Sequence, residues 1–174
     1  HTSIGENALR PYGFGEQPVS PPKRLAPSTQ RPPANKQSAM PDAASKKEGG
    51  KILMVTSLDD GHPCDNIIDG QEASYWMSTG LYPQEILVAL KGPCMISTIK
   101  LATTNVKSVR IEGCAEEKPV NFHVLAEGDL EEKGGSIQIK DLKVQDGSTT
   151  ASFVKLQILS GYHDFCSVHT IKVE

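Results

Sequence analysis

The segment NIIDGQEASYW, residues 66–76, holds the pattern that decides the fold. Its apolar residues Ile67 and Ile68 can anchor a tight loop, and Asp69 with Gly70 forms a turn in which the glycine permits a positive φ. Trp76 ends the segment and is expected to pack in the core, where large aromatic side chains bury most of their surface. The segment therefore predicts a tight loop between apolar anchors.

The same loop carries oxygen atoms that a hard cation can use. The Asp69 carboxylate, the Ser74 hydroxyl and the backbone carbonyls near Asn66 and Gln71 can converge in it, and Ca²⁺ takes roughly six to eight oxygen ligands. A turn in which Asp69 caps its own backbone, with no metal, explains the same residues. Because Asp-Gly is chiefly a turn signal, residue chemistry alone favours the turn and leaves the metal site open.

Outward from this loop, the chain from residue 51 onward alternates between short β-type runs and turn residues. At most residues 65–69 form a turn of helix, because no longer run shows the 3.6-residue spacing of an amphipathic helix. Gly92-Pro93 is among the expected breaks between strands. The pattern predicts eight strands, at residues 52–57, 85–90, 97–103, 108–112, 122–127, 136–144, 152–160 and 167–174.

Eight short strands in one domain are typical of an all-β, antiparallel sandwich or barrel. In the run 136–144, the apolar Ile137, Ile139 and Leu142 are expected to face the core, with a slip of the alternation near Asp141. Gln138 and its polar neighbours are then expected to face solvent.

The first 50 residues have a different composition. They contain eight of the 12 prolines and carry a formal charge of +3, whereas residues 51–174 carry −6. So few of these residues could form a core that we expect residues 1–50 to be a disordered, Pro-rich extension or linker. Residues 51–174 are expected to form the folded domain.

Composition and motifs exclude several functions. A net charge of −3 argues against a general nucleic-acid or anionic-membrane binder, and no apolar run has the length of a membrane span. Neither a nucleophile elbow nor a phosphate-binding or dinucleotide-binding motif is present, and the histidines lack metal-ligand spacing. We therefore expect no catalytic residues, no organic cofactor and no enzyme.

The four cysteines, at positions 64, 94, 114 and 166, lack the spacing of a zinc site. The chain shows no secretory signal at its start, so free thiols and a cytoplasmic location are expected rather than disulfides.

Longer motifs carry a resemblance to a known family. The segment 66–76 resembles the opening signature of discoidin-type, galactose-binding-like β-sandwiches. Together with EEKPVNFHV (116–124) and HDFCSVHTIKVE (163–174), the stretch 62–88 is similar to the intraflagellar transport subunit 25 family, also labelled small heat-shock-like protein beta-11. The resemblance covers residues 51–174 and none of the preceding extension.

The resemblance implies an eight-stranded antiparallel jelly-roll that binds one structural Ca²⁺ ion. It places the metal ligands at Asn66 (through its carbonyl), Asp69, Ser74 and Glu174. It also implies a non-enzymatic adaptor of the intraflagellar transport B complex, in cilia, flagella and basal bodies. The implied partner is a Rab-like small GTPase, intraflagellar transport subunit 27, in a tight heterodimer, with other B-complex subunits beyond it.

Two other functions compete with the adaptor. A glycan- or lipid-binding discoidin-type module is the alternative, although the domain has few aromatic residues for a sugar site. A chaperone of the small heat-shock type is suggested only by the family's label. Its I-x-I motif matches residues 137–139, but these lie inside a predicted strand.

Overall fold

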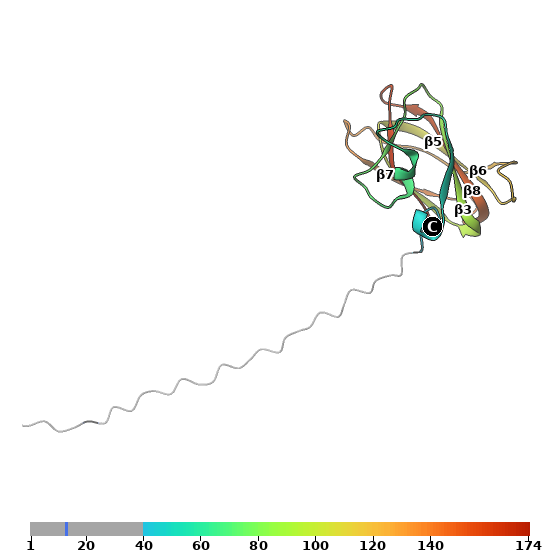
Figure 1. Cartoon of the computed structure of the whole chain (residues 1–174). Coiled ribbons are helices and arrows are strands. Elements are labelled where there is room, and N and C mark those ends of the chain that lie inside the picture. Colours follow the sequence, from blue (N-terminus) through green and yellow to red (C-terminus); the bar gives the residue numbers. More distant parts are fainter. Residues whose placement is uncertain (1–12, 14–39) are drawn as a thin grey trace, which may run out of the picture. The chain divides into compact units, whose positions relative to one another are not determined.

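The computed structural model describes residue 13 and residues 40–174, and these form a sandwich of two antiparallel sheets (Figure 1). One sheet has five strands in the order β1 (Lys51–Val55), β3 (Gln84–Ile96), β8 (Thr149–Gly161), β5 (Val106–Cys114) and β6 (His123–Asp129). The other has four, in the order β2 (Trp76–Met77), β9 (Ser167–Val173), β4 (Thr98–Thr104) and β7 (Gln138–Lys143). Two short 3₁₀ helices, η1 (Lys46–Glu48) and η2 (Cys64–Ile68), complete the described elements.

The predicted all-β sandwich is confirmed, and each of the eight predicted strands overlaps an observed one. Alternate residues of both sheets point inward and bury the core. The first sheet contributes Ile86, Val88, Val109, Ile111, Leu156 and Ile158, and the second contributes Ile99, Leu101, Leu142, Val168 and Ile171. The helical turn expected at residues 65–69 is η2. Among the described residues, none of the helices is long and apolar enough to cross a membrane.

Two details of the strand prediction differ from the structure. Gly92-Pro93 does not end a strand, because β3 continues to Ile96 and absorbs these residues where its register with β8 shifts, between Ala89 and Cys94. Such an irregularity accepts a proline, whose missing N–H would interrupt a regular ladder. The structure also adds the two-residue strand β2, in which Trp76 lies opposite Val168.

The expected orientation is confirmed for Leu142, which is buried, and wrong for the residues before it: Gln138 is 2% exposed, whereas Ile137 and Ile139 are 39% and 65% exposed. The buried amide is fully hydrogen-bonded. Its Oε1 accepts from the N–H of Val106 (3.0 Å) and the hydroxyl of Thr103 (3.2 Å), and its Nε2 donates to the carbonyls of Val106 and Glu131 (each 2.8 Å). Four partners offset the cost of burying a polar group, so the glutamine takes the inward position.

The folded unit begins before the predicted boundary at residue 50. Ala43 donates its N–H to the carbonyl of Val173 (2.8 Å), and Ala44 is completely buried. Asp42 Oδ1 accepts from the N–H groups of Val173 (2.9 Å) and Ala44 (3.1 Å). Residues 42–50 therefore pack on the end of β9 as part of the sandwich. Residues 40 and 41 are also described, whereas the rest of the predicted extension, apart from residue 13, lies outside the described residues.

We predict that the charge of Asp42 opposes folding at neutral pH. Burial is the main cause that raises the pKa of this carboxyl. The folded state therefore favours the protonated form, which stabilises the fold at low pH. This contribution is lost as the pH rises through the raised pKa. Asp42→Asn keeps the acceptor without the charge. We expect it to unfold about 2–4 °C above the wild type at pH 7, with the difference shrinking as the pH falls toward 4.

Thermal unfolding followed by circular dichroism checks this pH dependence. Asp42→Ala removes the acceptor and should lower the unfolding temperature, because a buried N–H that loses its partner costs about 1–3 kcal/mol. Asp146→Asn, at an exposed position, controls for the change in net charge. An Asn variant less stable than the wild type at pH 7 would contradict the expected sign.

Candidate metal-binding loop

The loop 69–75 is fixed at both ends by buried side chains. Ile67 and Ile68, on η2, are buried, and Trp76 on β2 is buried with its Nε1 donating to the carbonyl of Ser57 (3.0 Å). The expected core role of Trp76 is confirmed. Gly70 has a φ of 81°, which a glycine adopts without strain. The chain therefore leaves the core, turns and returns within a few residues.

Within this loop, Asp69 and Ser74 are brought together. Asp69 Oδ1 accepts from the N–H of Gln71 (2.7 Å), and Oδ2 lies 2.7 Å from the Ser74 hydroxyl. The Ser74 hydroxyl also lies 3.0 Å from the carbonyl oxygen of Gln71. The Ser74 hydroxyl thus lies within hydrogen-bonding reach of one Asp69 carboxylate oxygen and of the Gln71 carbonyl. This is the oxygen chemistry that Ca²⁺ prefers, and it equally forms the Asp-capped turn.

Asn66 closes the loop through its side chain. Its Nδ2 donates to the carbonyl of Tyr75 (2.9 Å), which joins η2 to the last residue of the loop. Three side chains of the segment 66–76 therefore have structural contacts: Asn66 joins the ends, Asp69 binds Gln71 and Ser74, and Trp76 anchors the return. The contribution of the Asn66 backbone carbonyl to a metal stays a prediction.

Glu174 lies in a different set of contacts. Its Oε2 forms an ion pair with Lys100 Nζ of β4 (2.7 Å), and its backbone carbonyl accepts from Ser97 (2.7 Å) and Thr98 (2.9 Å). No hydrogen bond of the described residues joins its carboxylate to the loop. Among residues 13 and 40–174, no group of three or more His, Cys, Asp and Glu residues is arranged for a metal ion. Glu174 as a ligand stays a prediction.

An aromatic column beside the loop is absent from the sequence prediction. The ring of Tyr75 stacks on His62, with centroids 4.4 Å apart, and its centroid lies 5.1 Å from that of His169. His62 Nδ1 lies 3.0 Å from Asp59 Oδ2. This hydrogen bond is the largest cause that lowers the pKa of the Asp59 carboxyl, and the N–H of Gly61 adds to it. The residues are spread over three segments, so no local pattern marks them.

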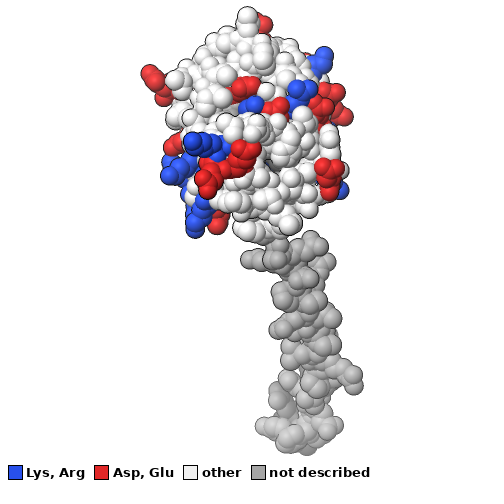
Figure 2. All heavy atoms as spheres, turned by 90° about the vertical axis from the view of Figure 1, so that its right-hand side faces the viewer, with Lys and Arg blue, Asp and Glu red and all other residues white. Residues whose placement is uncertain are grey.

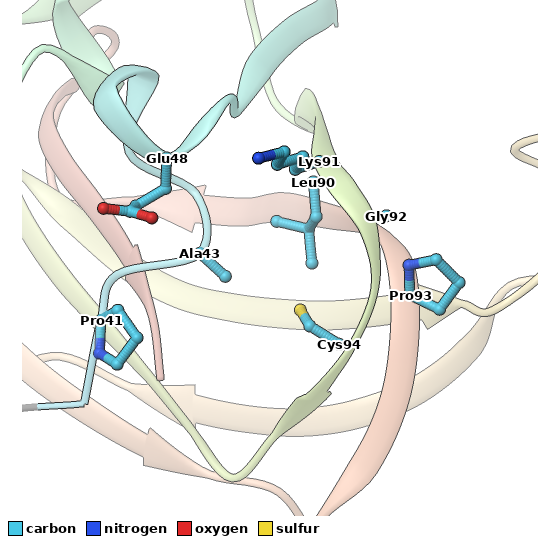
Figure 3. Close-up of a pocket in the computed structure, with 8 residues that line it drawn as sticks. All are labelled: Pro41, Ala43, Glu48, Leu90, Lys91, Gly92, Pro93 and Cys94. Carbon is cyan, nitrogen blue, oxygen red and sulfur yellow. The ribbon is translucent and has the colours of Figure 1, made fainter.

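Two cavities lie away from the loop's oxygen cluster. One of about 320 Å³ is lined by Tyr75, Phe165 and His169, among others. The other, of about 340 Å³, lies where the N-terminal segment passes β3, and Figure 3 shows Leu90 and Cys94 pointing toward Ala43 there. None of the predicted metal ligands lines either cavity. Burial raises the pKa of the Cys94 thiol, and all four cysteines are free.

Comparison with known proteins reveals relatives that match about three quarters of the chain. The chain is 33% identical to the intraflagellar transport protein 25 homolog of Mus musculus over 133 residues, which cover 76% of this chain and 92% of the mouse protein. Identity to the Homo sapiens homolog is 32%, over 76% of this chain and 91% of the human protein. Identity to intraflagellar transport protein 25 of Chlamydomonas reinhardtii is 29%, over 77% of this chain and 69% of the algal protein. No protein-family model matches the chain.

Solved structures with the same fold include two carbohydrate-binding modules of Clostridium perfringens. CpGH89CBM32-5, in complex with GalNAc-β-1,3-galactose, superposes with a TM-score of 0.62 at 26% identity, covering 71% of this chain and 94% of the module. The family 32 module of NanJ, in complex with galactose, superposes with a TM-score of 0.64 at 21% identity, covering 76% of this chain and 97% of the module. These likenesses establish a galactose-binding-like sandwich.

Proposed function

The chain belongs to the intraflagellar transport protein 25 family, and we propose that it is a non-enzymatic adaptor subunit of the intraflagellar transport B complex. Membership associates it with intraflagellar transport in cilia and flagella. In this proposal it forms a tight heterodimer with a Rab-like small GTPase, intraflagellar transport subunit 27. It also holds one structural Ca²⁺ ion in the loop 69–75.

The outer face of the five-stranded sheet supports a docking role, because four of its charged side chains form ion pairs within the chain and a fifth, that of Glu85, is hydrogen-bonded. Residues directly opposite each other on neighbouring strands form these pairs across β6, β5, β8 and β3. They are Arg110 Nε with Glu127 Oε1 (2.6 Å), Lys155 Nζ with Glu112 Oε2 (2.7 Å) and Gln157 Nε2 with Glu85 Oε1 (2.7 Å). This pairing is the observation that carries the choice of face.

Apolar side chains share that face with the paired charges. Strand alternation places Leu159 and Val124 on the same side as these pairs, and they are 38% and 40% exposed. Figure 2 views the side of the sandwich where β3, β6 and β8 are labelled in Figure 1. Acidic and basic residues lie next to one another there, with uncharged surface between them.

Such a face can be buried at low cost. Burying a charge whose partner is lost is expensive, whereas a pair closed within one chain keeps its partner when another protein covers it. A paired sheet also loses little conformational freedom on docking, because its backbone is already ordered. Both arguments favour the outer face of the five-stranded sheet as the surface for the GTPase.

We predict that Leu159→Asp disrupts the heterodimer. The variant places a new, unpaired carboxylate in the proposed interface, so we expect the affinity for the GTPase to fall at least about tenfold. Co-purification of the full chain with intraflagellar transport subunit 27, followed by titration calorimetry, measures it.

Ile139→Asp is the matched control, because Ile139 is an exposed aliphatic residue on a strand of the other sheet. It should leave the affinity unchanged. Loss of binding with Ile139→Asp alone would move the interface to the four-stranded sheet. Failure of the wild-type chain to bind the GTPase would overturn the partner itself.

The calcium part of the proposal is supported by the oxygen cluster of Asp69, Ser74 and Gln71. A bound Ca²⁺ ion would neutralise the carboxylate and hold the loop's oxygens together. With Asn66 and Glu174 as further ligands, it would link the loop to the end of β9.

We predict that Asp69→Ala abolishes Ca²⁺ binding and that Ser74→Thr retains it, since threonine supplies the same hydroxyl. Saturating Ca²⁺ should raise the wild-type unfolding temperature, because a ligand at a hundred times its Kd stabilises the folded state by about 2.7 kcal/mol. Calorimetric titration and unfolding with Ca²⁺ or chelator measure both effects.

Asp65→Ala is the matched control, because Asp65 is a neighbouring acid paired with Lys46 (2.8 Å) rather than with the loop. It should keep Ca²⁺ binding. Equal unfolding temperatures of the wild type in Ca²⁺ and in chelator would refute the structural role of the ion.

A glycan-binding module remains the second candidate. The observation that favours it is the cavity of about 320 Å³, where the exposed ring of Phe165 and the ring of Tyr75 offer aromatic surface. Binding of galactose by a chain that fails to bind the GTPase would select this candidate.

A further inference from the structure

His169 occupies an irregular position in β9. Ala102 of β4 lies opposite Thr170, but the next residue, Thr103, lies opposite Val168, so His169 has no residue opposite it. This is the arrangement of a β-bulge, in which one extra residue interrupts the ladder and its side chain is redirected. In β9 the bulge directs the imidazole to the loop 69–75.

The imidazole has a defined set of partners. His169 Nδ1 lies 3.0 Å from the carbonyl oxygen of Glu72, within the loop. A carbonyl only accepts, so Nδ1 carries the proton and donates. Nε2 lies 3.2 Å from the hydroxyls of Thr104 and Ser167, which can donate to it. With these contacts His169 is only 9% exposed, and its ring orientation is fixed.

The ring also supports the end of the loop. The ring centroid of Tyr75 lies 4.4 Å from that of His62 and 5.1 Å from that of His169, so both imidazoles pack against it. Asn66 holds the carbonyl of the same tyrosine (2.9 Å). The loop is thus attached to β9 at two places, the Glu72 carbonyl and the Tyr75 ring, and both attachments go through His169.

We propose that His169 is a positioning residue for the candidate metal loop. By donating to the Glu72 carbonyl and packing on Tyr75, it keeps Asp69 and Ser74 in the geometry in which their oxygens converge. The part of this inference that concerns calcium affinity rests on the proposed function, whereas the part that concerns loop order does not.

Variants of the full chain separate the hydrogen bond from packing. His169→Asn places an amide N–H near the position of Nδ1 and can still donate to Glu72, whereas His169→Gln places its amide near Nε2. His169→Ala removes both contacts. His123→Ala, at an exposed position of β6, is the control for loss of a histidine.

Amide hydrogen exchange in chelator measures loop order without metal. The Gln71 N–H, which donates to Asp69, should exchange about tenfold faster in the Ala and Gln variants than in the wild type. The Asn and His123 variants should stay within about threefold of it. Exchange at Leu156, in the core of β8, reports global unfolding. If the Ala variant unfolds globally, the comparison of Asn with Gln decides.

If the Gln71 N–H exchanged as slowly in both the Gln and Ala variants as in the wild type, the positioning role would be overturned. Equal loss of its protection in the Asn and Gln variants would overturn it too. Titration with Ca²⁺ tests the second part: the Gln variant should bind about tenfold more weakly than the Asn variant. A wild type that binds no Ca²⁺ refutes the proposed ion, and the exchange result then decides the role of His169 independently.

Discussion

The burial of Trp76 is the constraint on which the loop and its surroundings depend. The indole fills the core and its N–H is paired with Ser57, so the position of β2 relative to β1 is fixed. Ile67 and Ile68 fix η2 in the same core. A loop whose two ends are held this way has few conformations left to lose, so weak contacts between its own polar groups suffice to order it.

Burial of polar side chains is the second constraint, and it explains where the sequence misled. Every buried side-chain nitrogen and oxygen of the described residues has a hydrogen-bond partner. Gln138 obtains its partners from Thr103, Val106 and Glu131, which lie on other segments. Alternation along one strand can be read from sequence, but the presence of partners across the sheet cannot. Strand positions were therefore predictable, and the orientation of Gln138 and Ile139 in β7 was not.

In the candidate site too, local contacts are predictable from the sequence and contacts between strands are not. Asp69 and Ser74 are five residues apart, so local turn chemistry brings them together and the sequence predicts their meeting. Glu174 is distant in sequence, and its position depends on the pairing of β9 with β4, where Lys100 binds it. His169 contacts the loop only because a bulge shifts the register after Ala102. A bulge depends on both strands, so neither sequence segment alone indicates it.

Fold and function separate clearly in this sandwich. The carbohydrate-binding modules share the architecture at 21–26% identity, yet a fold does not determine what its loops and faces bind. The sheet face offers two cross-strand ion pairs and a hydrogen bond between Gln157 and Glu85, which favours a protein surface. In the loop, the Asp69 carboxylate contacts the Ser74 hydroxyl, which also contacts the Gln71 carbonyl. Because both lie on one rigid core, an ion at the loop can stabilise the domain without reshaping the face, and this makes a structural role for calcium more consistent than a switching one.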